Sequence, residues 1–128
     1  MKILLDTHAL IWFCNGDKQL PKKTAKIIED PTVDCYVSIA SLWEIAIKLN
    51  LDKLSLNVKF PELKNILKEH NINILELRFE HLEQLTKLKT IHRDPFDRVI
   101  IAQSISDKMS VATKDDIFKD YKVNVIWN

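Results

Sequence analysis

Short apolar stretches that favour strands alternate along the whole chain with segments of helical spacing. The expected strands are residues 2–5, 35–40, 72–77, 109–113 and 123–127, and the expected helices are 8–14, 21–30, 41–50, 61–70, 79–89, 97–106 and 115–120. Strands separated by helices form βαβ units, which build a parallel sheet with helices on both faces. We therefore predict an α/β fold for residues 1–128: a single domain with three α/β/α layers and a parallel central sheet.

The composition excludes several classes of protein. Gly16 is the only glycine, so the chain has neither a P-loop nor a GxGxxG nucleotide fingerprint, because both need several glycines. The net charge of +1 gives no global basic field, although it is compatible with a local basic rim around an acidic centre. The isolated Cys14 and Cys35, without a signal peptide, indicate a reducing, cytoplasmic setting. No apolar run is long enough to span a membrane.

Four acidic residues stand where the expected strands end. Asp6 directly follows the first strand, and Glu44 lies early in the helix after the second. Asp97 opens the apolar helix 97–106, and Asp115 follows the strand 109–113. The carboxyl ends of parallel strands meet at one edge of a sheet, where function gathers in such folds. We therefore expect these four carboxylates to converge.

Each of these acids also has a structural interpretation. Asp6 is suited to cap the helix that follows it. Ser41 and Glu44 have the spacing of a capping box, in which each side chain bonds the backbone N–H of the other residue. Asp115 or Asp116 is suited to cap the last short helix. Only the shared position of the acids argues for chemistry.

The stretch HRDPFDR, residues 92–98, contains two aspartates that are not equivalent. Asp94 before Pro95 predicts a helix N-cap followed by proline at the first helical position. Asp97 then lies at the third helical position, where a carboxylate complements the helix dipole. Because the helix continues as RVIIA, Asp97 sits at the mouth of a buried element, and it is the stronger candidate for chemistry.

Converging carboxylates repel one another strongly unless a cation neutralises them. Oxygen ligands favour a hard divalent ion, Mg²⁺ or Mn²⁺. Such an ion usually binds only a few carboxylates and keeps several waters, one of which can attack a phosphodiester. The sequence therefore predicts a divalent-metal site at the carboxyl edge of the sheet.

Four blocks of this sequence resemble the PIN-domain nucleases, and most of all the VapC-type toxins of bacterial toxin–antitoxin pairs. The blocks are LLDTHALIW, SIASLWEIAIK, HRDPFDRVIIAQS and VATKDDIF, and their order and spacing cover essentially the whole chain. The resemblance implies a Mg²⁺-dependent endoribonuclease, with Mn²⁺ as the alternative ion, that is the toxin of a type II toxin–antitoxin pair. Such an enzyme cleaves RNA by metal-activated water attack on a phosphodiester and leaves a 5′-phosphate and a 3′-hydroxyl.

The resemblance also assigns residues to roles. The family's first, second and fourth acids fall on Asp6, Glu44 and Asp115, and its third falls on Asp97 rather than on Asp94. Asp6 and Asp97 are the candidate metal ligands. Glu44 and Asp115 would complete the acidic cluster or position the attacking water. Three neighbours are auxiliary candidates, with Thr7 suited either to orient a ligand water or to cap the first helix: Thr7, Asp94 and Asp116.

The partners implied by the resemblance are RNA, a cognate antitoxin that binds an apolar groove, and a second copy of the chain in a homodimer. Arg93, Arg98 and Lys114 border the acids and are candidate contacts for RNA phosphates. The alternative for each of these three residues is a solvated charged rim. No membrane partner is expected.

Two other functions compete with a ribonuclease toxin. A phosphoacceptor receiver-like signalling domain also alternates strands with helices and binds Mg²⁺, but it needs an acidic pair after the first strand, where this chain has Asp6 and Thr7. A non-catalytic RNA-binding PIN module is the second alternative, and the intact set of acids argues against it.

Aromatic residues near the first two blocks have two interpretations. Trp12, Phe13 and Trp43 are expected in the core, with an interface as the alternative. The four histidines share no metal-ligand spacing. His92 is expected on the surface, and contact with RNA is its alternative role.

Overall fold

Five short strands pair in parallel in the order β3-β2-β1-β4-β5. The central strand β1 pairs with β2 on one side and with β4 on the other, so that Leu5 lies opposite both Val37 and Ala112. The computed structural model, which describes residues 1–128, has the strands β1 (Lys2–Leu5), β2 (Asp34–Ser38), β3 (Ile72–Leu75), β4 (Ser110–Ala112) and β5 (Val125–Ile126).

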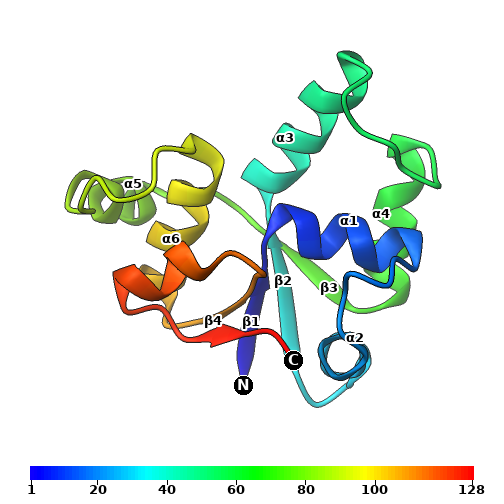
Figure 1. Ribbon diagram of the computed structural model, residues 1–128, viewed down its shortest axis with the longest axis horizontal. Helices are drawn as coiled ribbons and strands as arrows, with labels where there is room; N and C mark the ends of the chain where they lie inside the picture. The colour runs from blue at the N-terminus through cyan, green and yellow to red at the C-terminus, as the bar shows by residue number, and fades with distance from the viewer.

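Helices cover both faces of this sheet (Figure 1). One face carries α1 (Thr7–Asn15), α2 (Lys22–Glu29), α3 (Ile39–Asn50) and α4 (Phe60–Glu69). The other face carries α5 (Phe79–Thr86), α6 (Pro95–Asp107) and the 3₁₀ helix η1 (Asp116–Tyr121). The predicted α/β/α layers and parallel central sheet are confirmed.

Alternate side chains of β1 enter two separate apolar cores, because successive residues of a strand point to opposite faces. Ile3 and Leu5 belong to a core of 15 buried residues shared with the first four helices. Leu4 belongs to a core of nine buried residues that includes Ile100 and Ile101 of α6. The strand is therefore buried on both faces, as expected for the centre of a parallel sheet.

The strand order also decides between two of the functional hypotheses. A receiver-type domain has the order 2-1-3-4-5, with its third strand beside its first. Here β2 lies between β3 and β1, which gives the order 3-2-1-4-5. The receiver-like alternative is therefore wrong.

The start of α3 corrects one sequence prediction. The strand expected over 35–40 ends at Ser38, whose hydroxyl accepts a hydrogen bond of 3.1 Å from the Ala40 N–H and caps the helix. Ser41 is consequently inside the helix, and the capping box predicted for Ser41 and Glu44 is wrong. An N-cap serine three residues earlier moves Glu44 out of the first turn, so its carboxylate is available to other partners.

Other differences lie at element ends and at one aromatic side chain. The helix expected over 79–89 ends at Thr86, and the strand expected over 123–127 covers only Val125–Ile126. Trp43, expected in the core, is 63% exposed, because α3 turns this side chain away from the larger core. Trp12 and Phe13 are partly buried against that core, as predicted. No helix combines the length and the apolar character needed to cross a membrane.

Candidate functional site

A cavity of about 280 Å³ opens at the carboxyl edge of the sheet, where β1 and β4 end. We refer to it as the acid cavity. Three of the four predicted acids line it, together with two aromatic rings and one lysine. The lining residues are Asp6, His8, Trp12, Asp97, Lys114 and Asp115.

Asp6 is both a helix cap and a member of the acid cavity. Its carboxylate accepts a hydrogen bond of 2.8 Å from the Ala9 N–H, and its side chain is almost fully buried. The pKa of Asp6 is raised to about 6, chiefly by burial; hydrogen bonds from Thr113 and Ala9 oppose the rise, and the charges of Asp115 and Glu44 contribute to it. The structural and chemical interpretations of Asp6 are therefore compatible.

The two aspartates of HRDPFDR separate as predicted. The Asp94 carboxylate accepts from the N–H groups of Phe96 and Asp97 and caps α6, with Pro95 at the first helical position. Asp97 lies one turn into the helix and faces the acid cavity. The pKa of Asp97 is raised to about 6, chiefly by burial and also by the charges of Asp94 and Asp6, while the contact with His92 opposes the rise.

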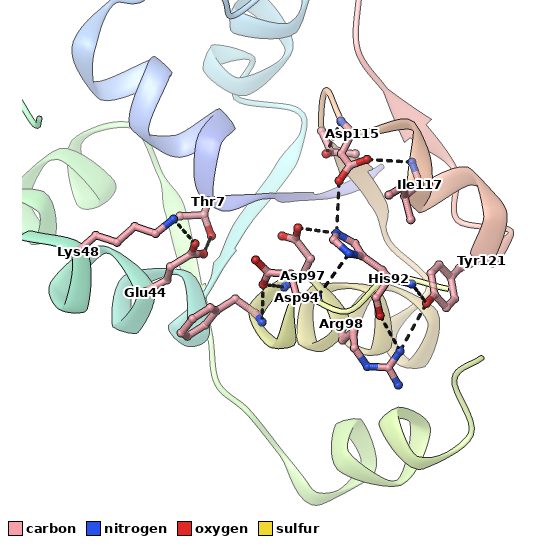
Figure 2. Close-up of polar contacts among 12 residues, drawn as sticks. Thr7, Glu44, Lys48, His92, Asp94, Asp97, Arg98, Asp115, Ile117 and Tyr121 are labelled. Carbon is pink, nitrogen blue, oxygen red and sulfur yellow. Dashed lines mark hydrogen bonds and ion pairs between the residues drawn. The ribbon is translucent and has the colours of Figure 1, made fainter. Parts of the chain in front are cut away.

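His92 lies against the acids, although a surface position was predicted from the sequence (Figure 2). Its Nε2 lies 2.8 Å from Asp97 Oδ2 and 3.3 Å from Asp115 Oδ2. The side chain is only 14% exposed, and the three residues can present one ligand atom each within 4.8 Å of one another. The sequence carried one indication of this position, because His92 stands two residues before Asp94, which caps the helix that carries Asp97.

Tyr121 and Arg98 hold the loop that carries His92. The Tyr121 hydroxyl accepts from the N–H groups of Ile91 and His92 and donates to the Lys89 carbonyl. Arg98 Nη1 donates to the carbonyls of Lys89 and His92, at 3.0 and 3.1 Å. These contacts engage the Arg98 guanidinium within the protein (Figure 2). Arg98 therefore supports this loop through Nη1, and its contact with RNA phosphates stays a prediction.

Glu44 is buried beside the acid cavity and does not line it. Its carboxylate accepts hydrogen bonds of 2.7 Å from the Thr7 hydroxyl and of 2.7 Å from Lys48 Nζ (Figure 2). Thr7 also lies 3.0 Å from the Ser41 hydroxyl. The cap of α1 is Asp6 and not Thr7. Glu44 influences the acid cavity through its negative charge, which contributes to the raised pKa of Asp6.

The turn after β4 separates Asp115 from Asp116. Asp115 caps η1 by accepting from the Ile117 N–H, and its other oxygen faces His92. Asp116 is exposed and pairs with Lys119 at 3.4 Å, outside the acid cavity. Asp116 therefore does not join the cluster.

The other two candidate phosphate contacts are Lys114 and Arg93. Lys114 is exposed at the cavity lining, with its Nζ 5.9 Å from the ring centre of Trp12. Trp12 in turn lies against His8, with 5.5 Å between the ring centres. Arg93 is exposed. The lining of the acid cavity therefore includes two aromatic rings and one lysine.

The donor set of the acid cavity fits a hard divalent cation. Carboxylates of Asp6, Asp97 and Asp115 face a common space, and the pKa of both Asp6 and Asp97 is raised by burial and by neighbouring negative charge. Bringing a divalent cation among them offsets this mutual repulsion, and oxygen donors suit Mg²⁺ and Mn²⁺. Asp6, Asp97 and Asp115 are thus the residues placed to hold such an ion.

The fold and the acid cavity together define an α/β domain with a carboxylate-rich site of the kind that holds a divalent ion. The chain belongs to the PIN domain family, whose model matches residues 3–124. This membership confirms the family that the four sequence blocks predicted. PIN domains are generally metal-dependent nucleases.

Several solved structures share this fold. VapBC2 from Rickettsia felis, bound to a DNA fragment from its promoter, has a TM-score of 0.76 at 14% identity over 100% of both chains. FitAcB from Neisseria gonorrhoeae has a TM-score of 0.62 at 21% identity, over 98% of this chain and 96% of that one. FitAB bound to an IR36 DNA fragment has a TM-score of 0.62 at 23% identity, over 97% of this chain and 93% of the other. No curated protein matches the sequence.

Proposed function

We propose that residues 1–128 form one PIN-like ribonuclease domain that cleaves RNA and acts as the toxin of a toxin–antitoxin pair. The observation that carries this proposal is the convergence of Asp6, Asp97 and Asp115 on one cavity, with Glu44 buried beside it. A non-catalytic PIN module would have no need to keep buried carboxylates together at the cost of their mutual repulsion.

In this proposal Asp6 and Asp97 are the principal ligands of a Mg²⁺ or Mn²⁺ ion, and Asp115 completes the set. The bound ion supplies Lewis-acid polarisation of the phosphate and lowers the pKa of a water. Glu44, fixed by Thr7 and Lys48, adds negative charge behind Asp6.

Basic residues next to the acids of the site suit a polyanionic substrate. Lys114 lies at the lining, where its ammonium group can contact a phosphate of a bound strand. Arg93 is exposed on the loop before α6 and is the second candidate contact. Such contacts bind the backbone without reading its sequence, so they favour RNA binding in general over any one target.

The proposed protein partner is an antitoxin segment that lies in an apolar groove between α3 and α4. A structure of the same fold from Klebsiella pneumoniae, with a TM-score of 0.58 at 17% identity, is a toxin–antitoxin complex. The groove encloses about 560 Å³, and Trp43 and Phe60 are 63% and 40% exposed along it. A homodimer is proposed as well, on the family resemblance. The groove residues are Ile39, Leu42, Trp43, Ala46, Phe60, Pro61, Leu63, Lys64, Leu67 and Ile74.

The decisive experiment is sequencing of cellular RNA ends after induced expression of the wild type, of Asp97→Asn and of Asp116→Asn. New ends with a 5′-phosphate are expected for the wild type. Asp97→Asn should produce none, because it removes a ligand charge from the acid cavity with little change of volume. Asp116→Asn is the matched control, since this exposed acid lies outside the cavity, and it should cut like the wild type. Equal cleavage by folded Asp97→Asn would refute the assignment of the site.

A further inference from the structure

The ring of His92 occupies the space between two carboxylates of the acid cavity, and the resemblance to PIN nucleases assigns it no role. We propose that His92 supplies a nitrogen ligand to the divalent ion and that this ligand makes the site prefer Mn²⁺ to Mg²⁺. This inference rests on the proposed function, because it concerns the same metal site. It adds one imidazole to a donor set that the family resemblance describes as carboxylates alone.

The first support for this proposal is the spacing of the donor atoms. His92 Nε2 lies 2.8 Å from Asp97 Oδ2 and 3.3 Å from Asp115 Oδ2. Neighbouring ligands of a small octahedral ion at 2.0–2.1 Å lie about 3 Å apart. The imidazole nitrogen therefore already stands at ligand spacing from two carboxylate oxygens.

The second support is that the protein holds the His92 backbone and leaves the ring facing the acids. The His92 N–H donates to the Tyr121 hydroxyl at 2.7 Å, and its carbonyl accepts from Arg98 at 3.1 Å. Both contacts fix the main chain on the side of η1 and α6 (Figure 2). A ligand whose backbone is fixed in this way loses little conformational freedom when an ion binds.

Coordination through Nε2 requires that the ring carry its proton on Nδ1. The neighbour of Nδ1 is the Asp94 N–H, at 3.4 Å, which is the longest contact of the His92 ring to a hydrogen-bonding partner. The proton therefore passes from Nε2 to Nδ1 through solvent, and the weak contact to Asp94 is lost. The Asp94 cap of α6 is unaffected, because it uses the carboxylate of that residue.

The donor set determines the preferred ion. Mg²⁺ takes oxygen ligands and dehydrates reluctantly, whereas imidazole is a typical ligand of transition ions such as Fe²⁺, Ni²⁺ and Zn²⁺. Mn²⁺ stands at the oxygen-preferring end of that series, and as a transition ion it tolerates a nitrogen ligand better than Mg²⁺ does. Mn²⁺ accepts both carboxylate oxygen and imidazole nitrogen, so the nitrogen of His92 should increase its affinity over that of Mg²⁺. Without this ring the remaining ligands are oxygens, and the preference should shrink.

The test uses Mn²⁺ as the probe and does not depend on RNA cleavage. Pulsed electron paramagnetic resonance of the Mn²⁺-loaded full chain detects a directly bonded ¹⁴N nucleus. The wild type should give this nitrogen coupling, and His92→Gln should lack it. Calorimetric titration should show that His92→Gln weakens Mn²⁺ binding by at least about tenfold and Mg²⁺ binding by less.

His8→Gln is the matched control, because His8 is the other imidazole at the acid cavity. This variant should keep the nitrogen coupling. Loss of the coupling in His8→Gln, or its persistence in His92→Gln, would overturn the proposal.

A wild type that binds Mn²⁺ without nitrogen coupling would refute the role of His92 alone. A wild type that binds neither ion would refute the proposed metal-dependent nuclease as well. Circular dichroism should give the same spectrum for both variants, since neither substitution touches the backbone contacts of Tyr121 and Arg98.

Discussion

The buried carboxylate of Asp6 should destabilise the metal-free protein at neutral pH. Its pKa is raised from 3.8 to about 6, chiefly by burial, so the folded state binds this proton more tightly than the unfolded chain does. The free energy of unfolding should therefore fall as pH rises from about 4 to about 6, and the stabilisation present below pH 3.8 is lost above pH 6. The difference between 3.8 and about 6 corresponds to about 3 kcal/mol.

Asp6→Asn isolates this contribution. The amide oxygen can still accept from the Ala9 N–H and cap α1, while the charge is gone. The hydrogen bond between Thr113 and the carboxylate is the one that changes, at a cost of about 1 kcal/mol. At pH 7.5 the variant should therefore be more stable than the wild type by about 2 kcal/mol, and at pH 4 this advantage should disappear.

The assay is urea unfolding of both proteins in a chelator, at a series of pH values from 4 to 7.5. The free energy of unfolding is plotted against pH for each protein, and one curve is subtracted from the other. The difference removes the contributions of titrating groups that do not interact with Asp6. Added Mg²⁺ should stabilise the wild type and reduce the advantage of the variant, because the ion binds the folded state. A variant that is less stable than the wild type at pH 7.5, or a difference that does not change with pH, would refute the reasoning.

Three further substitutions have outcomes that follow from the contacts. Asp94→Asn should retain cleavage and cost about 1 kcal/mol or less, because asparagine also caps a helix; loss of all activity in a stably folded variant would rank Asp94 above Asp97. Tyr121→Phe should lower the free energy of unfolding by about 2 kcal/mol in chemical denaturation, since the N–H groups of Ile91 and His92 lose their acceptor; an unchanged midpoint would show that water replaces the hydroxyl. Lys114→Ala should weaken binding of non-cleavable RNA uniformly across sequences and reduce the salt dependence by about one ion; an unchanged salt slope would place Lys114 outside the RNA path.

The fold was predictable because its signal is repeated along the chain. Apolar strands and helical segments alternate along the whole chain, and each expected helix supports the same parallel arrangement, so an error of a few residues at one boundary does not alter the sheet. The convergence of Asp6, Asp97 and Asp115 on one edge followed directly from this arrangement. The inequality of Asp94 and Asp97 was also predictable, because proline at position 95 fixes where α6 begins.

The features that the sequence did not predict depend on choices between equivalent local partners or on distant contacts. Ser38 and Ser41 are both acceptable caps, and the pairing of Ser38 with β3 places the end of β2 at the earlier serine. The place of His92 depends on Tyr121, which lies 29 residues further along the chain. The exposure of Trp43 depends on the turn of α3 on which it falls, and that turn follows from the choice of cap.

The acid cavity draws its carboxylates from segments that lie far apart in the sequence. Asp6 follows β1, and Asp115 follows β4, which pairs with β1 in the sheet. During synthesis on the ribosome, β1 and β2 can pair long before β4 exists. A growing chain therefore carries an incomplete site until β4 and Asp115 have emerged, and any activity of this cavity must wait for that segment.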